Sequence, residues 1–200
     1  MNNVNYIQLI SENHPTVGCS AQDEFDYSTL VWLSGDEIPP KEELDLAWIE
    51  IVRKEKNDEI NRYRDEVFLA TEGFWFQGNI YECDTLAKSN VTGAITAVVV
   101  GAALPSDYTW RSKTNINVPM NAQQLTGMGV SMGAYISTIF SWTWQLKEVL
   151  ATMPDRDTIE GFNPADYWPN NNFDGTGPGG ITTMQSLQAA AIKLATDYPQ

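Results

Sequence analysis

The sequence predicts an α+β fold: a helix-rich body with two β-hairpins, a small N-terminal α/β unit, and a C-terminal extended arm ending in a helix. Three observations predict it. Apolar residues recur at helical spacing in several long segments. Aromatic and β-branched runs twice flank short turns, and the last quarter of the chain is rich in Pro, Gly and Asn. We expect three parts, at residues 1–56, 57–153 and 154–200.

The N-terminal unit is expected to contain two short strands, at residues 6–10 and 27–33, because both runs are rich in aromatic and β-branched side chains. The prolines at 39–40 then open a helix, since proline suits the first helical turn. Residues 53–59 are polar all round, as in a solvated helix that joins two packed units. We therefore place a domain boundary there, inside a continuous helix.

The body is expected to begin with a hairpin whose loop is Gly78-Asn79, a typical two-residue turn. A helix over about residues 85–104 and a second hairpin over residues 109–118 follow. Asn121 then caps a helix of about 28 residues that ends near Thr152.

Charge is unevenly distributed along the chain. The formal net charge is −14, which argues against nucleic acid as a partner, because phosphate binding needs clustered Lys and Arg. Residues 114–146 carry no charged side chain at all. Gln, Ser and Thr interrupt that stretch, so it does not predict a membrane span. We expect it to be buried within the fold or between subunits.

Small residues recur every fourth position in the two central helices. A four-residue step places each set on one helix surface that drifts slowly around the axis. Such stripes allow close approach of helix backbones, either between these two helices or across an oligomer axis. The first stripe is Ser89, Gly93, Ala97 and Gly101, and the second is Gly129, Gly133, Ser137 and Ser141.

The C-terminal arm carries large apolar residues in a segment too rich in Pro, Gly and Asn to form its own core. Such residues need a surface to cover them. We expect the arm to dock on a neighbouring subunit; the alternative is that it folds back on its own body. The residues concerned are Phe162, Tyr167, Trp168 and Phe173, and Met184, Leu187 and Leu194 of a terminal helix.

The sequence offers no pattern typical of a catalytic, cofactor or metal site. His14 is the single histidine and lies before a proline in a loop. Two oxygen-rich groups, Asp155/Asp157/Glu160 and residues 170–175, resemble cation loops in part but follow no complete ligand register, and ordinary turns explain them. The two cysteines match no disulfide or zinc spacing, and the N-terminus lacks the pattern of a signal peptide. We expect a protein that is not an enzyme and has no cofactor.

Residues 62–150 resemble a phage-tail domain of unknown function found in tail, tail-fibre and neighbouring virion proteins. The resemblance rests on the following residues: Arg64-Asp65, Gly73, Gly78, Tyr81, Asp84, Gly93-Ala94-Ile95, Trp110-Arg111, Asn115, Val118 and Asn121-Ala122-Gln123-Gln124-Leu125. The segment from Leu30 to Leu44 is similar to N-terminal segments of tail accessory proteins. The resemblance lends no catalytic residues.

The resemblance implies a structural component of a bacteriophage tail, such as an adaptor, baseplate or tail-fibre-associated subunit. Its partners would be other tail proteins and itself as a homo-oligomer, with no nucleic acid and no membrane. The protein would be synthesised in the host bacterial cytoplasm and reside in the virion. Two alternatives stay open: a tail-fibre assembly chaperone absent from the mature virion, and a host-glycan-binding module. For the second, Trp32, Trp75, Trp110 and Trp168 are the candidates for stacking on sugars.

Overall fold

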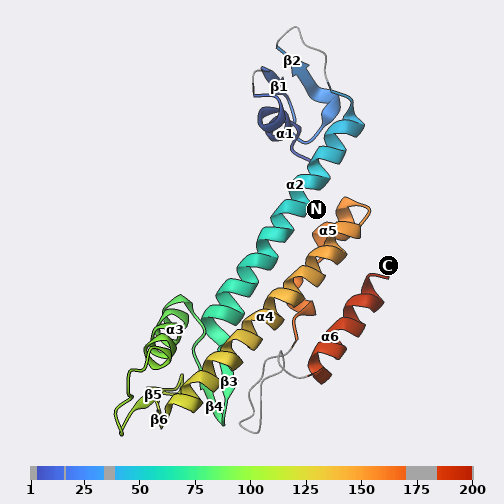
Figure 1. The fold of residues 1–200 in the computed structure, drawn as a ribbon. Coiled ribbons are helices and arrows are strands. Elements are labelled where there is room, and N and C mark those ends of the chain that lie inside the picture. Colours follow the sequence, from blue (N-terminus) through green and yellow to red (C-terminus); the bar gives the residue numbers. More distant parts are fainter. Residues whose placement is uncertain (1–3, 16, 34–38, 170–183, 200) are drawn as a thin grey trace. The chain divides into compact units, whose positions relative to one another are not determined.

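The fold is α+β, as predicted, and is rich in helices with short antiparallel hairpins (Figure 1). The computed structural model describes residues 4–15, 17–33, 39–169 and 184–199. The chain forms two compact units. Unit 1 contains residues 1–56 and 154–161, and unit 2 contains residues 57–153 and 162–200. Each unit has buried apolar residues of its own.

Unit 1 combines short elements from the N-terminal segment with one short helix from later in the chain. Its elements are α1 (Tyr6–Asn13), β1 (Cys19–Ala21), the 3-10 turn η1 (Tyr27–Thr29), β2 (Leu30–Trp32), the first part of α2 (Lys41–Tyr63), and α5 (Arg156–Gly161). β1 and β2 pair antiparallel, with Ser20 opposite Val31. The predicted strand at residues 27–33 is therefore a 3-10 turn followed by a short strand.

The strand predicted at residues 6–10 is wrong, because this segment forms helix α1. Asn5 caps the helix, its side chain accepting a hydrogen bond from the backbone N–H of Gln8 at 2.9 Å. Tyr6, Leu9 and Ile10 are buried, at the spacing of one helix face. A short apolar run fits both periods, and here the cap decides between them.

Helix α2 begins at Lys41, directly after the two prolines, and runs unbroken to Tyr63. Residues 53–59 are therefore helical, as predicted, but only Lys54, Glu55 and Asp58 are exposed, and the other four are half-buried. The chain continues as a π-helix, η2 (Arg64–Glu72), which the sequence did not predict. Gly73, at φ +82°, ends it.

Unit 2 contains two hairpins, two long helices and the C-terminal elements. They are β3 (Phe74–Phe76), β4 (Asn79–Tyr81), α3 (Thr85–Val99), β5 (Thr109–Arg111), β6 (Asn117–Pro119), α4 (Ala122–Thr152), the 3-10 turn η3 (Pro164–Tyr167) and α6 (Met184–Asp197). The first hairpin pairs Phe76 with Asn79, so its loop is Gln77-Gly78, one residue earlier than predicted. Both loop residues have positive φ, at 46° and 84°, as a type I′ turn requires.

The ends of the two long helices follow from local capping. Helix α3 ends at Val99, about five residues before the predicted end, because Gly101 adopts φ +92° and turns the chain. Helix α4 begins where predicted. Asn121 forms a capping box with Gln124, in which each side chain accepts a hydrogen bond from the other residue's backbone N–H.

Helix α4 buries one side along most of its length. Its buried apolar residues follow one another at steps of three and four: Leu125, Met128, Met132, Tyr135, Ile139, Trp142, Leu146 and Leu150. This is the spacing of a single apolar stripe on a helix. The Tyr135 hydroxyl, deep in this stripe, donates a hydrogen bond to the carbonyl oxygen of Phe68 at 3.0 Å. One side of α4 thus belongs to the core of unit 2.

Candidate assembly surface

From Thr126 to Trp144, the opposite side of α4 is exposed and uncharged. Six residues along it, named here the neutral face, are all exposed: Thr126, Val130, Gly133, Ser137, Ser141 and Trp144. Val130 is 70% exposed and Trp144 is 61% exposed. Because no residue between Lys113 and Lys147 is charged, the whole face carries no charge.

Helices α3 and α4 pack on each other, as one of the two alternatives from the sequence expects, but Gly93 and Gly133 of the small-residue stripes lie outside this contact. Only Gly129 packs closely between the helices: a Cβ atom there would lie 2.2 Å from Cδ1 of Ile95 on α3. A Cβ atom on Gly133 would meet nothing within 4 Å. A four-residue step advances about 40° around a helix of 3.6 residues per turn, so the stripe rotates away from α3 after Gly129.

The first stripe is also mostly exposed. Ser89 and Gly93 face outward on α3, Ala97 is half-buried, and Gly101 lies beyond the helix end. A Cβ atom on Gly93 would meet nothing within 4 Å. The contact between α3 and α4 is instead formed by branched side chains, including Ile95, against Gly129. The exposed members of the two stripes are therefore Ser89 and Gly93 on α3, and Gly133, Ser137 and Ser141 on α4.

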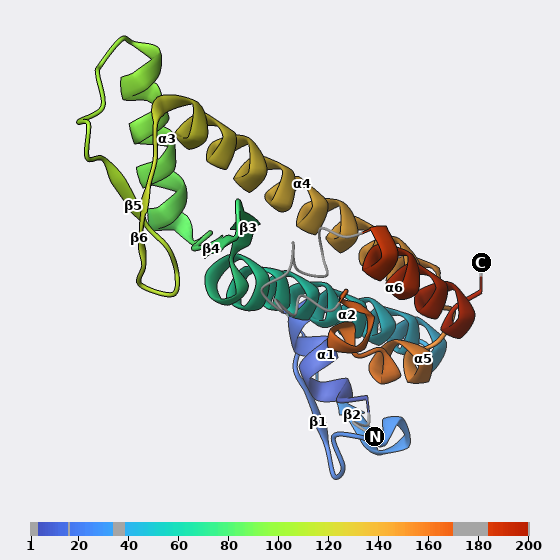
Figure 2. The same cartoon turned by 90° about the horizontal axis from the view of Figure 1, so that it is seen from below.

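A groove lies between α4 and α6 and shares Ser137 and Ser141 with the neutral face. Figure 2 shows α3 beside the N-terminal end of α4 and α6 beside its C-terminal half. The groove has a volume of about 460 Å³ and is lined by uncharged residues. These are Ser137, Thr138, Ser141, Trp142 and Gln145 of α4, and Leu187, Gln188 and Ala191 of α6. The groove offers hydroxyl, amide and apolar groups, which suit packing more than acid–base chemistry.

The aromatic residues of the predicted docking arm pack on the chain's own unit 2. Phe162, Tyr167 and Trp168 are all buried. Trp168 stacks on Phe68 with ring centroids 4.5 Å apart. The Trp142 indole N–H donates a hydrogen bond to the carbonyl oxygen of Tyr167 at 3.0 Å. These contacts match the alternative in which the segment folds back on its own body.

The terminal helix α6 is held by the same cluster. Its Leu194 is buried and its Leu187 half-buried. The Tyr167 hydroxyl donates a hydrogen bond to Asp197 Oδ2 at 3.0 Å, and Lys193 Nζ lies 3.9 Å from the Tyr167 ring centroid. Burial and the hydrogen bonds raise the pKa of Tyr167. Of the other predicted arm residues, Phe173 and the side chain of Met184 lie outside the described part.

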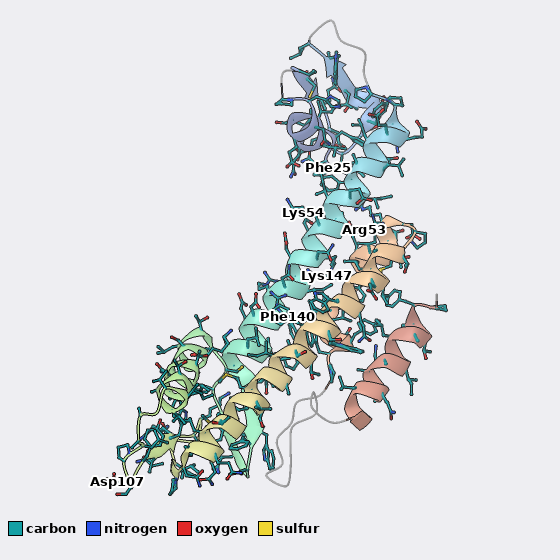
Figure 3. The ribbon with its side chains drawn as sticks, viewed as in Figure 1. Phe25, Arg53, Lys54, Asp107, Phe140 and Lys147 are labelled. Atoms are coloured by element: carbon teal, nitrogen blue, oxygen red, sulfur yellow. The ribbon has the colours of Figure 1, made fainter. Side chains whose placement is uncertain are left out.

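One flank of α4 marks the limit of the neutral face. Figure 3 shows Phe140 and Lys147 on this helix. The Arg64 guanidinium lies 4.5 Å from the centroid of the Phe140 ring and also binds Asp65. Burial and then Arg64 lower the pKa of Lys147, while Asp58 and Asp65 act in the opposite direction. Charged groups thus begin where the neutral face ends.

The carboxylates after α4 have local partners within unit 1. Asp155 caps α5, accepting hydrogen bonds from the Thr158 N–H and hydroxyl at 2.9 Å each, and these bonds lower its pKa. Glu160 accepts a hydrogen bond from Arg156 at 2.7 Å. Within the described ranges no three His, Cys, Asp or Glu residues gather as metal ligands, and residues 170–175 lie outside those ranges. His14 follows α1, and its backbone N–H donates a hydrogen bond to the Ile10 carbonyl oxygen.

The four tryptophans considered for sugar stacking differ in unit and in burial. Trp168 is buried in unit 2, whereas Trp32 belongs to unit 1. Trp75 and Trp110 are half-buried. Trp110 lines a separate hollow of about 370 Å³ between α3 and β5, together with Tyr108, Arg111, Glu82, Leu86, Ala87, Asn90 and Thr109.

Comparison with known families places most of unit 2 in one domain. The model of the family DUF4376, described as a domain of unknown function, matches residues 51–166, and the chain belongs to this family. The match begins within α2 and includes both hairpins of unit 2, α3 and all of α4. No curated protein and no solved structure matches the chain. In the part of the chain that the structure describes, no helix is both long and apolar enough to span a membrane.

Proposed function

We propose that the chain is a structural, non-enzymatic subunit of a bacteriophage tail that acts by binding other protein subunits. The observation that carries this proposal is the neutral face of α4, a surface without charge in a chain of net charge −14. Val130 and Trp144 supply exposed apolar area on this face, and aromatic residues are enriched at protein interfaces. Depletion of charge at the centre is also typical of such interfaces.

The resemblance of residues 62–150 to phage-tail domains supports the assignment to a tail. These residues lie inside the range 51–166 that defines the family match. The proposed role is that of an adaptor, baseplate or tail-fibre-associated subunit, which reaches the virion after synthesis in the host cytoplasm. Its surface of hydroxyl, amide and apolar groups suits the packing of repeated subunits.

The test is protein identification on purified phage particles, combined with two matched variants. Trp144→Glu places a charge on the neutral face, and Ile192→Glu places one on α6, where the native side chain is 67% exposed. We expect the protein in particles, with incorporation lost for Trp144→Glu and kept for Ile192→Glu. Absence of the wild-type protein from particles, together with binding to fibre subunits, would instead identify a tail-fibre assembly chaperone.

A second candidate function, binding of a host glycan, is favoured by the hollow beside Trp110. Aromatic faces at Trp110 and Tyr108 and polar groups at Arg111 and Asn90 are the kinds of group that bind sugars. Isothermal titration calorimetry, with the surface polysaccharide of the host bacterium titrated into the protein, would test this function. Binding that is lost in Trp110→Ala and kept in Trp144→Ala would support the glycan-binding function over a purely structural one.

A further inference from the structure

The residues of the neutral face form a symmetric series about Ser137. Gly133 and Ser141 lie four residues to either side, and Val130 and Trp144 lie seven residues to either side. The series therefore reads large, small, small, small, large in both directions along the helix. Thr126 and Glu148, both exposed, extend it to eleven residues on each side. In an antiparallel pair of identical helices, each residue would meet its counterpart from the opposite end.

From this series we infer that the neutral face binds a second copy of the chain, with the two α4 helices antiparallel and a two-fold axis passing at Ser137. A two-fold interface uses the same patch on both subunits, which requires the patch to be complementary to itself. This inference deepens the proposed assembly function. It rests on that function only for the claim that the dimer forms part of a larger structure.

The sizes of the side chains fit two helices that cross at Ser137. Crossed helices are closest at the crossing point and diverge on either side of it. Small residues at the centre allow the backbones to approach, and a Cβ atom on Gly133 would meet nothing from its own chain. Val130 and Trp144 lie about 10 Å along the axis from Ser137, at 1.5 Å per residue. Larger side chains fill the wider gap there, Val130 of one copy against Trp144 of the other.

Charge favours a second copy in this orientation. Two chains of net charge −14 repel each other, and the neutral face brings no carboxylate of one copy against a carboxylate of the other along its central length. Antiparallel helices also align their dipoles favourably. The exposed Glu148 of each copy comes to lie beside Thr126, near the start of the partner's α4, where the helix dipole is positive.

A single cysteine on the axis tests the arrangement directly. Ser137→Cys would place two thiols face to face, within the short Cα separation that a disulfide needs. Ser89→Cys is the matched control, because it is also an exposed helical serine of unit 2 but lies off the face. Both variants are made with Cys19→Ser, because the half-buried Cys19 thiol could itself cross-link. Under mild oxidation we expect a reducible covalent dimer for Ser137→Cys and none for Ser89→Cys. Equal cross-linking of both variants would overturn the inference.

The oligomeric state of the full chain gives a second readout. Wild-type protein should sediment as a dimer, and Val130→Glu and Trp144→Glu should each be monomeric with unchanged circular dichroism. Ile192→Glu should remain dimeric. A wild-type chain that is monomeric at about 1 mM, where even a weak dimer would form, contradicts the inference. If that monomer still enters tails and Trp144→Glu does not, the face binds another tail protein instead of a second copy.

The two proposals fail in different ways. A dimer that depends on Val130 and Trp144, in a protein absent from purified particles, would refute the proposed tail function and leave the two-fold interface standing. A protein present in particles, without the Ser137→Cys cross-link in solution or in particles, would refute the interface and leave the tail function standing.

Discussion

Three glycines of unit 2 meet different surroundings, so their replacement by alanine should change stability in a defined order. Gly73 has φ +82° and ψ 179°, a region essentially restricted to glycine, where a side chain costs about 1–3 kcal/mol. A Cβ atom there would also lie 2.4 Å from the backbone carbonyl oxygen of Tyr81, and overpacking of this kind costs about 1–3 kcal/mol. We expect Gly73→Ala to lower the free energy of unfolding by about 2–6 kcal/mol in total.

Gly78 and Gly133 separate the two contributions. Gly78 has φ +84°, and a Cβ atom there would meet nothing within 4 Å, so Gly78→Ala should cost only the conformational part, about 1–2 kcal/mol. Gly133 lies inside α4 with open space around it, so Gly133→Ala should stabilise the protein by about 0.8–1.0 kcal/mol through helix propensity. Urea denaturation followed by circular dichroism at low protein concentration measures all three. A Gly73→Ala variant as stable as Gly78→Ala would refute the contact with Tyr81.

Two further predictions concern buried side chains. Trp142→Phe removes the indole N–H that donates to the Tyr167 carbonyl oxygen and leaves that buried acceptor unpaired. Urea denaturation should therefore show a free energy of unfolding lower by about 1–3 kcal/mol for Trp142→Phe, and no change for Trp144→Phe, whose side chain is exposed. Equal effects of the two substitutions would contradict the buried hydrogen bond. Burial raises the pKa of the Cys83 thiol to about 11, whereas Cys19 is only half-buried. Because the thiolate is the reactive form, iodoacetamide at pH 8 should modify Cys19 in the folded protein and should modify Cys83 only after urea unfolds the chain. Mass spectrometry of labelled peptides reads this out, and equal labelling of both cysteines in the folded protein would contradict it.

How much could be predicted from the sequence depended on whether a local signal was unique. The start of α4 was predictable because Asn121 and Gln124 form a capping box that has one structural meaning. The segment from Tyr6 to Ile10 was not, because five apolar and polar residues fit a strand and a helix equally, and the deciding group is the Asn5 side chain before them. The hairpin loop was predicted one residue late, since Gln77 takes a positive φ that its residue type does not announce.

The candidate surface was predictable in its composition and not in its direction. The absence of charge from residues 114–146 and the four-residue stripe are plain in the sequence. Which way the stripe points depends on where the neighbouring helix crosses α4, a tertiary contact made at Gly129 and Ile95. The burial of Phe162 could not be separated from docking on a neighbour, because an aromatic residue in an irregular segment needs a covering surface in either case.

The burial of the C-terminal aromatic residues decides between two ways of attaching to a partner. An attachment that used the side chains of Phe162, Tyr167 and Trp168 would have to withdraw them from unit 2, where all three are buried. Exposing three large apolar side chains costs roughly 5–9 kcal/mol at about 1.5–3 kcal/mol each. That is comparable to the whole stability of a typical domain, which is about 5–15 kcal/mol. The neutral face of α4 is already exposed and needs no such rearrangement, so binding there keeps the core of unit 2 intact. Assembly through α4, with the C-terminal segment serving as part of the fold, is therefore the arrangement that the energetics favour.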